Sequence, residues 1–153
     1  MDNPIHEGGC RCGRLRFRLR SDPVLTIACH CRGCQRMTAS AFSLGALHPT
    51  ASFEVVSGET LVGGLHGPAE HIHCSYCLSW IYTRPTLAAG VVFVRPTMLD
   101  HPDAFTPFVE FATSEKLPWA FTPAKRRFAG FPSREEFAAL LPDYAIHARE
   151  AAG

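Results

Sequence analysis

The seven cysteines of this 153-residue chain lie in three short clusters, and this grouping constrains the fold more than any other feature. The clusters are a pair, a trio and a second pair: Cys10 and Cys12; Cys29, Cys31 and Cys34 (the cysteine trio); Cys74 and Cys77. In a reducing compartment, clustered thiols are more often metal ligands or redox groups than disulfides. The odd number of cysteines points the same way. The sequence therefore predicts cysteine-based metal centres.

Length, charge and hydropathy exclude several classes of protein. A chain with 46% hydrophobic residues fits one domain with its own core, predicted here over residues 1–153. The net charge of +1 gives no general attraction to nucleic acids or anionic membranes, so neither is expected as a partner. We see no signal-peptide pattern and no apolar run long enough to cross a membrane. We therefore expect a cytoplasmic protein that acts on small molecules, and no sequence feature indicates its oligomeric state.

Alternating hydrophobicity predicts a mainly β fold. Between residues 13 and 20, Leu15, Phe17 and Leu19 alternate with arginines, which is the period of a half-buried strand. The arginine face is either an anion-binding stripe or, more often in such strands, the solvated outer face of a sheet. A helical turn could form over residues 33–40. Further strands are expected over residues 24–29, 41–47, 52–56, 60–66, 70–74, 80–83 and 87–94, bounded by glycine and proline turns.

One longer helix is predicted near the C-terminus, over residues 133–141. Ser133 and Glu136 have the spacing of a capping box, and an apolar stripe follows them. Pro142 should end this helix, because proline interrupts the hydrogen-bond ladder. The core of the domain is expected over about residues 5–132.

The two cysteine pairs could together form one closed metal site. Residues i and i+2 of a strand point to the same side, so Cys10 and Cys12 would present both sulfurs together. The Cys-x-x-Cys turn of Cys74 and Cys77 offers two more sulfurs. Four thiolates make a structural zinc site, with a four-thiolate iron–sulfur centre as the alternative. The spacing also leaves open a partition in which a cysteine of the trio joins the first pair.

The cysteine trio could hold a second zinc ion through three thiolates. The fourth position would then be open, as in catalytic zinc sites that keep a place for water or substrate. Two other interpretations stay open. A histidine, either His30, His71 or His73, could close the site as a fourth ligand, or the thiols could remain metal-free and oxidise.

Polar residues elsewhere are candidates for substrate binding and proton transfer. Arg32 and Arg36 lie beside the trio in sequence and could bind substrate carboxylates, or they could be ordinary exposed arginines. For a general acid the sequence offers His30, His71 and Glu110, without deciding among them.

Three segments of the chain strongly resemble the family of glutathione-dependent formaldehyde-activating enzymes and centromere protein V. They are GGCRCGRLRF at residues 8–17, CHCRGCQRMTASAF at residues 29–42 and CSYC at residues 74–77. Weaker likeness occurs at residues 98–100, 117–121 and 131–132, so the resemblance covers roughly residues 5–132. Three clusters in the same order are much more specific than one short motif.

The resemblance implies a β-tent fold of stacked antiparallel sheets around a structural zinc ion. It implies that Cys10, Cys12, Cys74 and Cys77 hold this ion and that the trio holds a second, labile zinc ion. The implied activity is the addition of glutathione to formaldehyde, which gives S-hydroxymethylglutathione and is a carbon–sulfur lyase reaction in reverse. The trio would then be catalytic, with Zn²⁺ as cofactor and a thiol and a small carbonyl compound as substrates.

Three positions depart from the family pattern. Leu78 follows the last cysteine pair, where the family usually has glycine, and leucine resists the positive φ that such a turn can require. Ala39 stands where glycine is common, and residues 108–110 stand where many members carry a histidine, so that this polar group is either missing or replaced by Glu110. We expect these departures to affect activity more than fold.

Two functions of other classes compete with the enzyme. The chain could be a non-catalytic zinc scaffold that binds protein, as the centromere branch of the family suggests. It could also be a redox sensor whose trio releases zinc when its thiols are oxidised.

Overall fold

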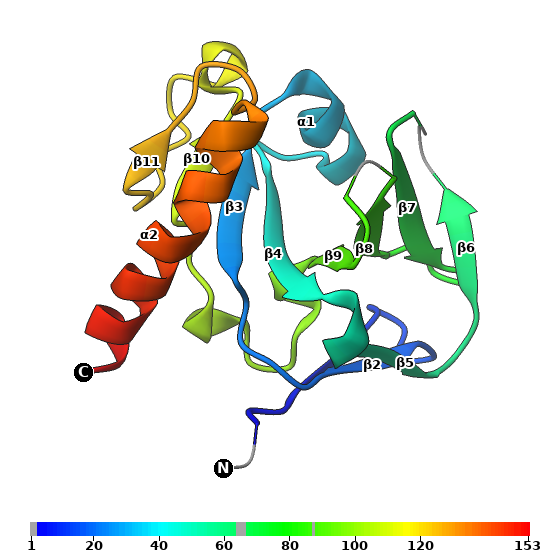
Figure 1. The fold of residues 1–153 in the computed structure, drawn as a ribbon. Helices are drawn as coiled ribbons and strands as arrows, with labels where there is room; N and C mark the ends of the chain where they lie inside the picture. Colours follow the sequence, from blue (N-terminus) through cyan, green and yellow to red (C-terminus); the bar gives the residue numbers. More distant parts are fainter. Residues whose placement is uncertain (1–2, 64–66, 87) are drawn as a thin grey trace. The chain divides into compact units, whose positions relative to one another are not determined.

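The structure of the chain is a computed structural model that describes residues 3–63, 67–86 and 88–153. Within these residues the fold is mainly β, with two sheets and two α-helices, as predicted (Figure 1). The strands are β1 (His6–Gly9), β2 (Arg16–Leu19), β3 (Leu25–Cys29), β4 (Ser43–Pro49), β5 (Phe53–Ser57), β6 (Thr60–Gly63), β7 (Ala69–Cys74), β8 (Trp80–Pro85), β9 (Val91–Val94), β10 (Val109–Phe111) and β11 (Arg126–Arg127). The helices are α1 (Arg32–Thr38) and α2 (Arg134–Ala152), and 3₁₀ turns lie at Thr50–Ser52, Pro96–Met98, Pro102–Ala104 and Thr113–Glu115.

The chain divides into two compact units. The first unit comprises residues 1–23 and 46–105, and the second unit comprises residues 24–45 and 106–153. The first unit contains both cysteine pairs and the second contains the trio, so each predicted metal centre belongs to one unit. The single domain over residues 1–153 stays a prediction.

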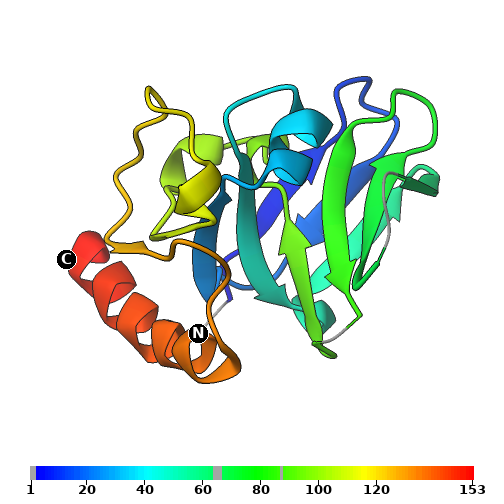
Figure 2. The same cartoon turned by 90° about the horizontal axis from the view of Figure 1, so that it is seen from above.

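The strands of the first unit pair antiparallel. β2 lies between β1 and β5 in one sheet. In the other sheet β9, β8, β7 and β6 run side by side, and residues 46–49 of β4 pair with β9 (Figure 2). These strands lie close to the ranges expected from the sequence. Residues 64–66 and 87, which belong to the strands expected over 60–66 and 87–94, lie outside the described residues.

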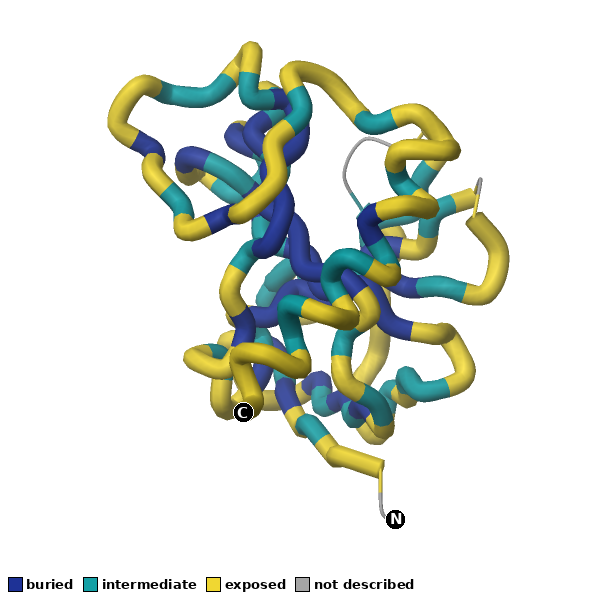
Figure 3. The backbone as a smooth tube through the Cα atoms, turned by 60° about the vertical axis from the view of Figure 1, so that its left-hand side comes forward, coloured by how far each residue is buried: buried dark blue, intermediate teal, exposed yellow. Residues whose placement is uncertain are grey.

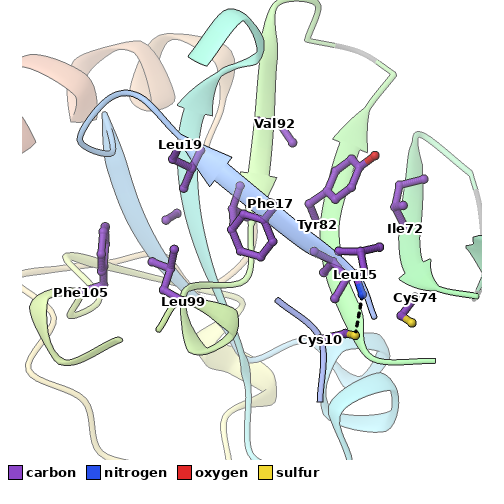
Figure 4. Close-up of a cluster of buried hydrophobic side chains, with 13 residues drawn as sticks. Cys10, Leu15, Phe17, Leu19, Ile72, Cys74, Tyr82, Val92, Leu99 and Phe105 are labelled. Carbon is purple, nitrogen blue, oxygen red and sulfur yellow. Dashed lines mark hydrogen bonds between the residues drawn. The ribbon is translucent and has the colours of Figure 1, made fainter. Parts of the chain in front are cut away.

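The alternation of β2 and the residues before it fills the core of the first unit. Leu15 and Leu19 are fully buried, and Phe17 is 1% exposed (Figure 4). The ring of Phe17 contacts that of Phe53, with centroids 5.7 Å apart. Burying each such side chain stabilises a fold by about 1.5–3 kcal/mol, so the predicted strand is also a principal source of stability.

The opposite face of β2 carries arginines that pair with acidic side chains of the same unit. The ion pairs are Arg16 with Asp100, Arg18 with Glu7, and Arg20 with Glu54. All six side chains are partly exposed, so each pair contributes little to stability. Because carboxylates of the same unit occupy the guanidinium groups, this face fits the solvated surface of a sheet better than an anion-binding stripe.

The second unit is built on short parallel strands. β10 lies between β3 and β11 and runs parallel to both. The two pairings of β10 therefore depart from the antiparallel arrangement expected for the sheets. α2 packs beside β3, and its Tyr144 and His147 rings contact Phe108, with centroids 5.5 and 5.0 Å apart (Figure 1).

α2 begins at the predicted capping box and continues beyond the predicted end. The Glu136 N–H donates to Ser133 Oγ, and the Ser133 N–H donates to Glu136 Oε2 at 2.7 Å. Pro142 lies inside the helix, although a proline there costs about 3 kcal/mol. The ring contacts with Phe108 stabilise the second half of the helix, and a partly exposed 2.7 Å ion pair between Arg126 and Asp143 adds a little. These tertiary contacts explain why the helix passes the proline.

α2 is largely exposed, whereas β3 and β10 of the same unit are largely buried (Figure 3). Leu140 is the buried residue of the helix. Of the helices within residues 3–63, 67–86 and 88–153, none has both the length and the hydropathy needed to cross a bilayer.

His48, in β4, is a fully buried titratable residue of the first unit. Its Nδ1 lies 3.3 Å from Ser21 Oγ, and its Nε2 has no hydrogen-bond partner among the described residues. Burial, followed by the nearby His6, lowers the pKa of His48 from 6.5 to about 4. His48 is therefore neutral at pH 7, and protonation would place a charge in poorly solvated surroundings.

We expect His48 to make the free energy of unfolding depend on pH. Between about pH 6.5 and pH 4 the unfolded chain binds a proton at His48 that the folded chain does not, so stability falls as the pH falls through this window. The loss should approach about 3 kcal/mol near pH 4. Urea unfolding at both ends of the window should show a smaller loss for His48→Gln than for the wild type. Exposed His101→Gln is the control, and equal losses in all three proteins would contradict the prediction.

Candidate metal centres

Four cysteine sulfurs of the first unit converge from two turns. Cys10 and Cys12 follow β1, Cys74 ends β7, and Cys77 lies in the turn before β8. Their Sγ atoms all lie within 4.8 Å of one another. We call these residues the four-cysteine group. The structure thus brings the two pairs together and leaves the trio as a separate group.

The spacing of these four sulfurs fits a tetrahedral metal ion. With metal–sulfur bonds of about 2.3 Å, the sulfurs of a tetrahedron lie about 3.8 Å apart. The Sγ atoms of Cys10 and Cys12 are 3.4 Å apart, and those of Cys12 and Cys74 are 3.9 Å apart. A disulfide would need about 2.05 Å. The four-cysteine group could therefore hold a metal ion.

Neighbouring donors stabilise negative charge on two of these sulfurs, those of Cys10 and Cys77. The Leu15 N–H donates to Cys10 Sγ at 3.3 Å, the contact drawn as a dashed line in Figure 4. Ser79 Oγ lies 3.2 Å from Cys77 Sγ, and this hydrogen bond lowers the pKa of Cys77 to about 5. Since the thiolate is the form that binds metals, both contacts favour coordination.

Leu78 completes the turn in a conformation that leucine rarely adopts. Its φ of 60° lies in the left-handed region, and its N–H donates to the Cys74 carbonyl at 3.0 Å. The turn between Cys74 and Cys77 therefore closes with a leucine at the position where the sequence resemblance leads us to expect glycine. The side chain is 59% exposed, so little packing offsets a backbone strain of about 1–2 kcal/mol.

The cysteine trio lies where β3 passes into α1. Cys29 ends β3, Cys31 is the N-cap of α1, and Cys34 lies in the first turn of this helix. The Cys34 N–H donates to Cys31 Sγ at 3.4 Å. All three Sγ atoms lie within 4.8 Å of one another, so the strand-to-helix turn assembles the predicted trio.

A cation would be needed to ionise all three thiols of the trio. The hydrogen bond with Cys34, followed by burial, raises the pKa of Cys29, and burial raises the pKa of Cys31. Thiolates at such distances repel one another, and a divalent cation removes this repulsion. Because thiolates are soft ligands that suit zinc, the donor set of the trio fits a zinc ion through three protein ligands.

No histidine closes the trio within the part of the chain that the structure describes. The ligand atoms gathered there are the three sulfurs. The side chain of His30 turns instead to Glu110, with Nε2 2.9 Å from Oε1. His71 and His73 belong to β7 of the first unit, where both rings contact Trp80.

Glu110 is a fully buried carboxylate in the strand next to the trio. Four side chains contact it at 2.8–2.9 Å: His30 Nε2, Lys116 Nζ and Thr122 Oγ1 at Oε1, and Arg127 Nε at Oε2. Burial raises the pKa of Glu110, but the hydrogen bonds from Lys116, Thr122 and His30 outweigh it and lower the pKa to about 2. Glu110 therefore has no proton to donate at neutral pH, which does not fit the role of general acid.

Gln35 connects α1 to the residues around the trio. Its buried Nε2 donates to the His30 carbonyl at 2.7 Å and to the Glu115 carbonyl at 3.0 Å. Arg32 donates to the Oε1 atom of Gln35, and Arg36 is exposed in the last turn of α1. Substrate binding by the two arginines stays a prediction.

Sequence reasoning missed the side chains that bind Glu110. Lys116, Thr122 and Arg127 follow it by 6, 12 and 17 residues in a segment without periodicity. Gln35 lies in the segment of residues 29–42 that resembles the family, but its residue type did not indicate that it would bind the carbonyls of His30 and Glu115. The one available signal was an acidic residue between apolar neighbours, because a carboxylate buried in a strand needs cationic partners.

A family model described as "Glutathione-dependent formaldehyde-activating enzyme" matches residues 5–115 of the chain. The chain belongs to this family. The matched residues include the four-cysteine group and the trio, so the resemblance inferred from the sequence is confirmed. Membership supports a glutathione-related, formaldehyde-activating function in general.

Solved and curated proteins add little to this family assignment. The crystal structure of a Rhodobacter sphaeroides protein matches with 18% sequence identity and a TM-score of 0.49. The match covers 61% of this chain and 87% of the Rhodobacter chain. No curated protein matches the sequence. The assignment therefore rests on the family model and on the cysteine geometry.

We expect Leu78→Gly to raise the free energy of unfolding by about 1 kcal/mol, because glycine adopts a positive φ without strain. Urea unfolding at equal metal content measures the change. Leu61→Gly is a matched control, since Leu61 is also an exposed leucine but lies within β6, where glycine should destabilise the strand. Destabilisation by Leu78→Gly would contradict the prediction.

Proposed function

We propose that the chain is a zinc-dependent enzyme that joins a thiol such as glutathione to formaldehyde or another small carbonyl compound. It would act at the trio as a carbon–sulfur lyase of the S-hydroxymethylglutathione synthase type, in the cytoplasm. The observation that carries this proposal is a set of three sulfurs within 4.8 Å, joined by no fourth side-chain ligand among the described residues. Family membership supports the choice of glutathione and formaldehyde.

The proposed reaction forms one carbon–sulfur bond. The thiol sulfur attacks the carbonyl carbon, the carbon–oxygen double bond becomes single, and the proton lost by the thiol ends on the new hydroxyl oxygen. A zinc ion at the trio would supply a Lewis-acidic centre with a position free for a thiol, and so favour its deprotonation. Because the uncatalysed addition is already facile, proximity would be the main gain.

The side chains around the trio would bind and orient the substrates. The three cysteines are half-buried, so a small molecule can reach them from solvent. Arg32 and Arg36 are exposed on α1, and their guanidinium groups suit the carboxylates of glutathione. His30 and Glu110 are fully buried, so the proton transfer would involve the thiol and water rather than these two side chains.

We further propose that the four-cysteine group holds a structural zinc ion. Its members span a separation of 62 residues between Cys12 and Cys74, so the ion would join two distant turns of the first unit. Closing a long loop in this way constrains the unfolded chain, and metal binding becomes part of the folding free energy.

We expect the purified protein to contain two zinc ions per chain. Cys31→Ser should lose the ion of the trio and keep the other, whereas Cys12→Ser should lose the ion of the four-cysteine group and unfold more readily. Elemental analysis combined with thiol titration measures both effects. One ion per chain, with the trio freely titratable in the wild type, would favour the redox sensor.

We expect glutathione to change the absorption spectrum of a cobalt-substituted trio and to protect the trio from alkylation. Exchange NMR of glutathione, formaldehyde and their adduct should show catalysis by the wild type and only the spontaneous rate with Cys31→Ser. If glutathione neither changes the spectrum nor protects the thiols, the thiol-substrate proposal is wrong. Capture of a protein partner that persists in Cys31→Ser would favour the scaffold.

A further inference from the structure

Glu110 has almost no capacity left to bind a substrate. A carboxylate offers about four acceptor positions. Three donors contact Oε1 and one contacts Oε2, and the side chain is fully buried. An anion in this position is tolerated only because Lys116 and Arg127 balance its charge. The role of Glu110 must therefore be exerted through the groups that it holds.

Of the side chains that contact Glu110, His30 is the one next to the cysteine trio, because it lies between Cys29 and Cys31 in the sequence. Three contacts restrain this residue. Its Nε2 donates to Glu110 Oε1 at 2.9 Å, its backbone N–H donates to the Phe111 carbonyl at 3.0 Å, and its carbonyl accepts from Gln35 Nε2 at 2.7 Å. Side chain and both backbone groups are thus held at once. Cys29 and Cys31 flank this restrained residue in the chain.

The contact with Glu110 also selects one form of the His30 ring. Because Nε2 faces a carboxylate that can only accept, the hydrogen lies on Nε2. Nδ1 is buried and has no hydrogen-bond partner among the described residues. No other described side chain holds the ring by a hydrogen bond, although the ring also packs edge-on against Phe42, with centroids 5.3 Å apart. The loss of Glu110 would therefore remove the contact that fixes which ring nitrogen carries the hydrogen.

A glutamine could not replace Glu110 in this arrangement. Glutamine offers one oxygen, and its NH₂ group would face a donor such as Lys116 or Arg127. It also removes the negative charge that both cations contact. Glu110→Gln keeps the size of the side chain but breaks the shared network.

We propose that Glu110 is a positioning residue that acts through His30 to hold the cysteine trio in the arrangement that binds metal. The proposal builds on the metal-binding trio of the proposed function. It does not require that glutathione or formaldehyde be the substrate. Outer groups that orient metal ligands typically contribute a factor of about 10–100 to metal affinity.

Competition with a chromophoric chelator, using zinc as the probe, tests this proposal at both centres. Glu110→Gln should weaken zinc binding by the trio about 10- to 100-fold and leave the four-cysteine group within about threefold of the wild type. Thr122→Val is the matched control, because it removes one donor from the same carboxylate oxygen and keeps the contact with His30. Its trio should bind zinc within about threefold of the wild type.

A double-mutant cycle shows whether Glu110 acts through His30. The variant Glu110→Gln with His30→Leu should bind zinc at the trio no more weakly than the weaker single variant. The ¹⁵N resonances of His30 provide a second readout. They should report one ring form, protonated at Nε2, in the wild type and a mixture in Glu110→Gln. A purely structural role would lower the stability without changing this signature.

The outcomes separate this proposal from the proposed function. Equal loss at both centres, additive losses in the cycle, or unchanged zinc affinity in Glu110→Gln would overturn the positioning role while glutathione still acted on the wild-type trio. If the coupling is found but glutathione has no effect, the function is wrong and the positioning role stands. A wild-type trio that binds no zinc would overturn both.

Discussion

Sulfur atoms held within 4.8 Å of one another are the constraint on which both units depend. Thiolates at this distance repel one another, so a cation is needed before either group can ionise fully. The consequences differ because the two groups close different lengths of chain. The four-cysteine group joins residues 62 positions apart, whereas the trio lies within one strand-to-helix turn. If each group holds an ion, its loss should unfold the first arrangement and only loosen the second, in line with the structural and reactive centres proposed above.

The features that could be predicted are those written in a few neighbouring residues. The period of two around Phe17, the capping box at Ser133 and the spacing of the cysteines each specify local geometry. The parallel pairing of β3 with β10 depends on a partner about eighty residues away, which no local pattern specifies. The prediction that the helix ends at Pro142 was wrong for a similar reason. Contacts with Phe108, which is distant in the sequence, outweigh the local effect of the proline. The hydrogen-bond donors around Glu110 could not be predicted, because the segment that carries them has no periodic sequence pattern.

Leu78 and Glu110 are two of the positions that the sequence resemblance marks as departures, and the structure accommodates them in different ways. At Leu78 the backbone keeps the turn, because the hydrogen bond to the Cys74 carbonyl persists and the side chain points into solvent. The effect of leucine at this position is therefore limited to strain in the backbone of Leu78. At Glu110 the backbone is unremarkable and the side chain changes the chemistry, because a full negative charge enters the buried region. That charge is tolerated only together with Lys116 and Arg127, so the departure involves several residues at once.

Removing the charges of such a network from water costs free energy that their attraction only partly offsets. Well-packed apolar residues often stabilise a protein equally well, so the network is poor evidence of a contribution to stability. The network around Glu110 is better explained by its effect on the geometry of the cysteine trio. When four ligands surround an ion, the ion itself helps to order them, as proposed for the four-cysteine group. Three ligands around an ion that must also accept a substrate receive less of this ordering, because one direction is left unspecified. The protein must then supply the missing order through groups behind the ligands. A saturated, buried carboxylate that holds the residue between two of the three cysteines is suited to that requirement.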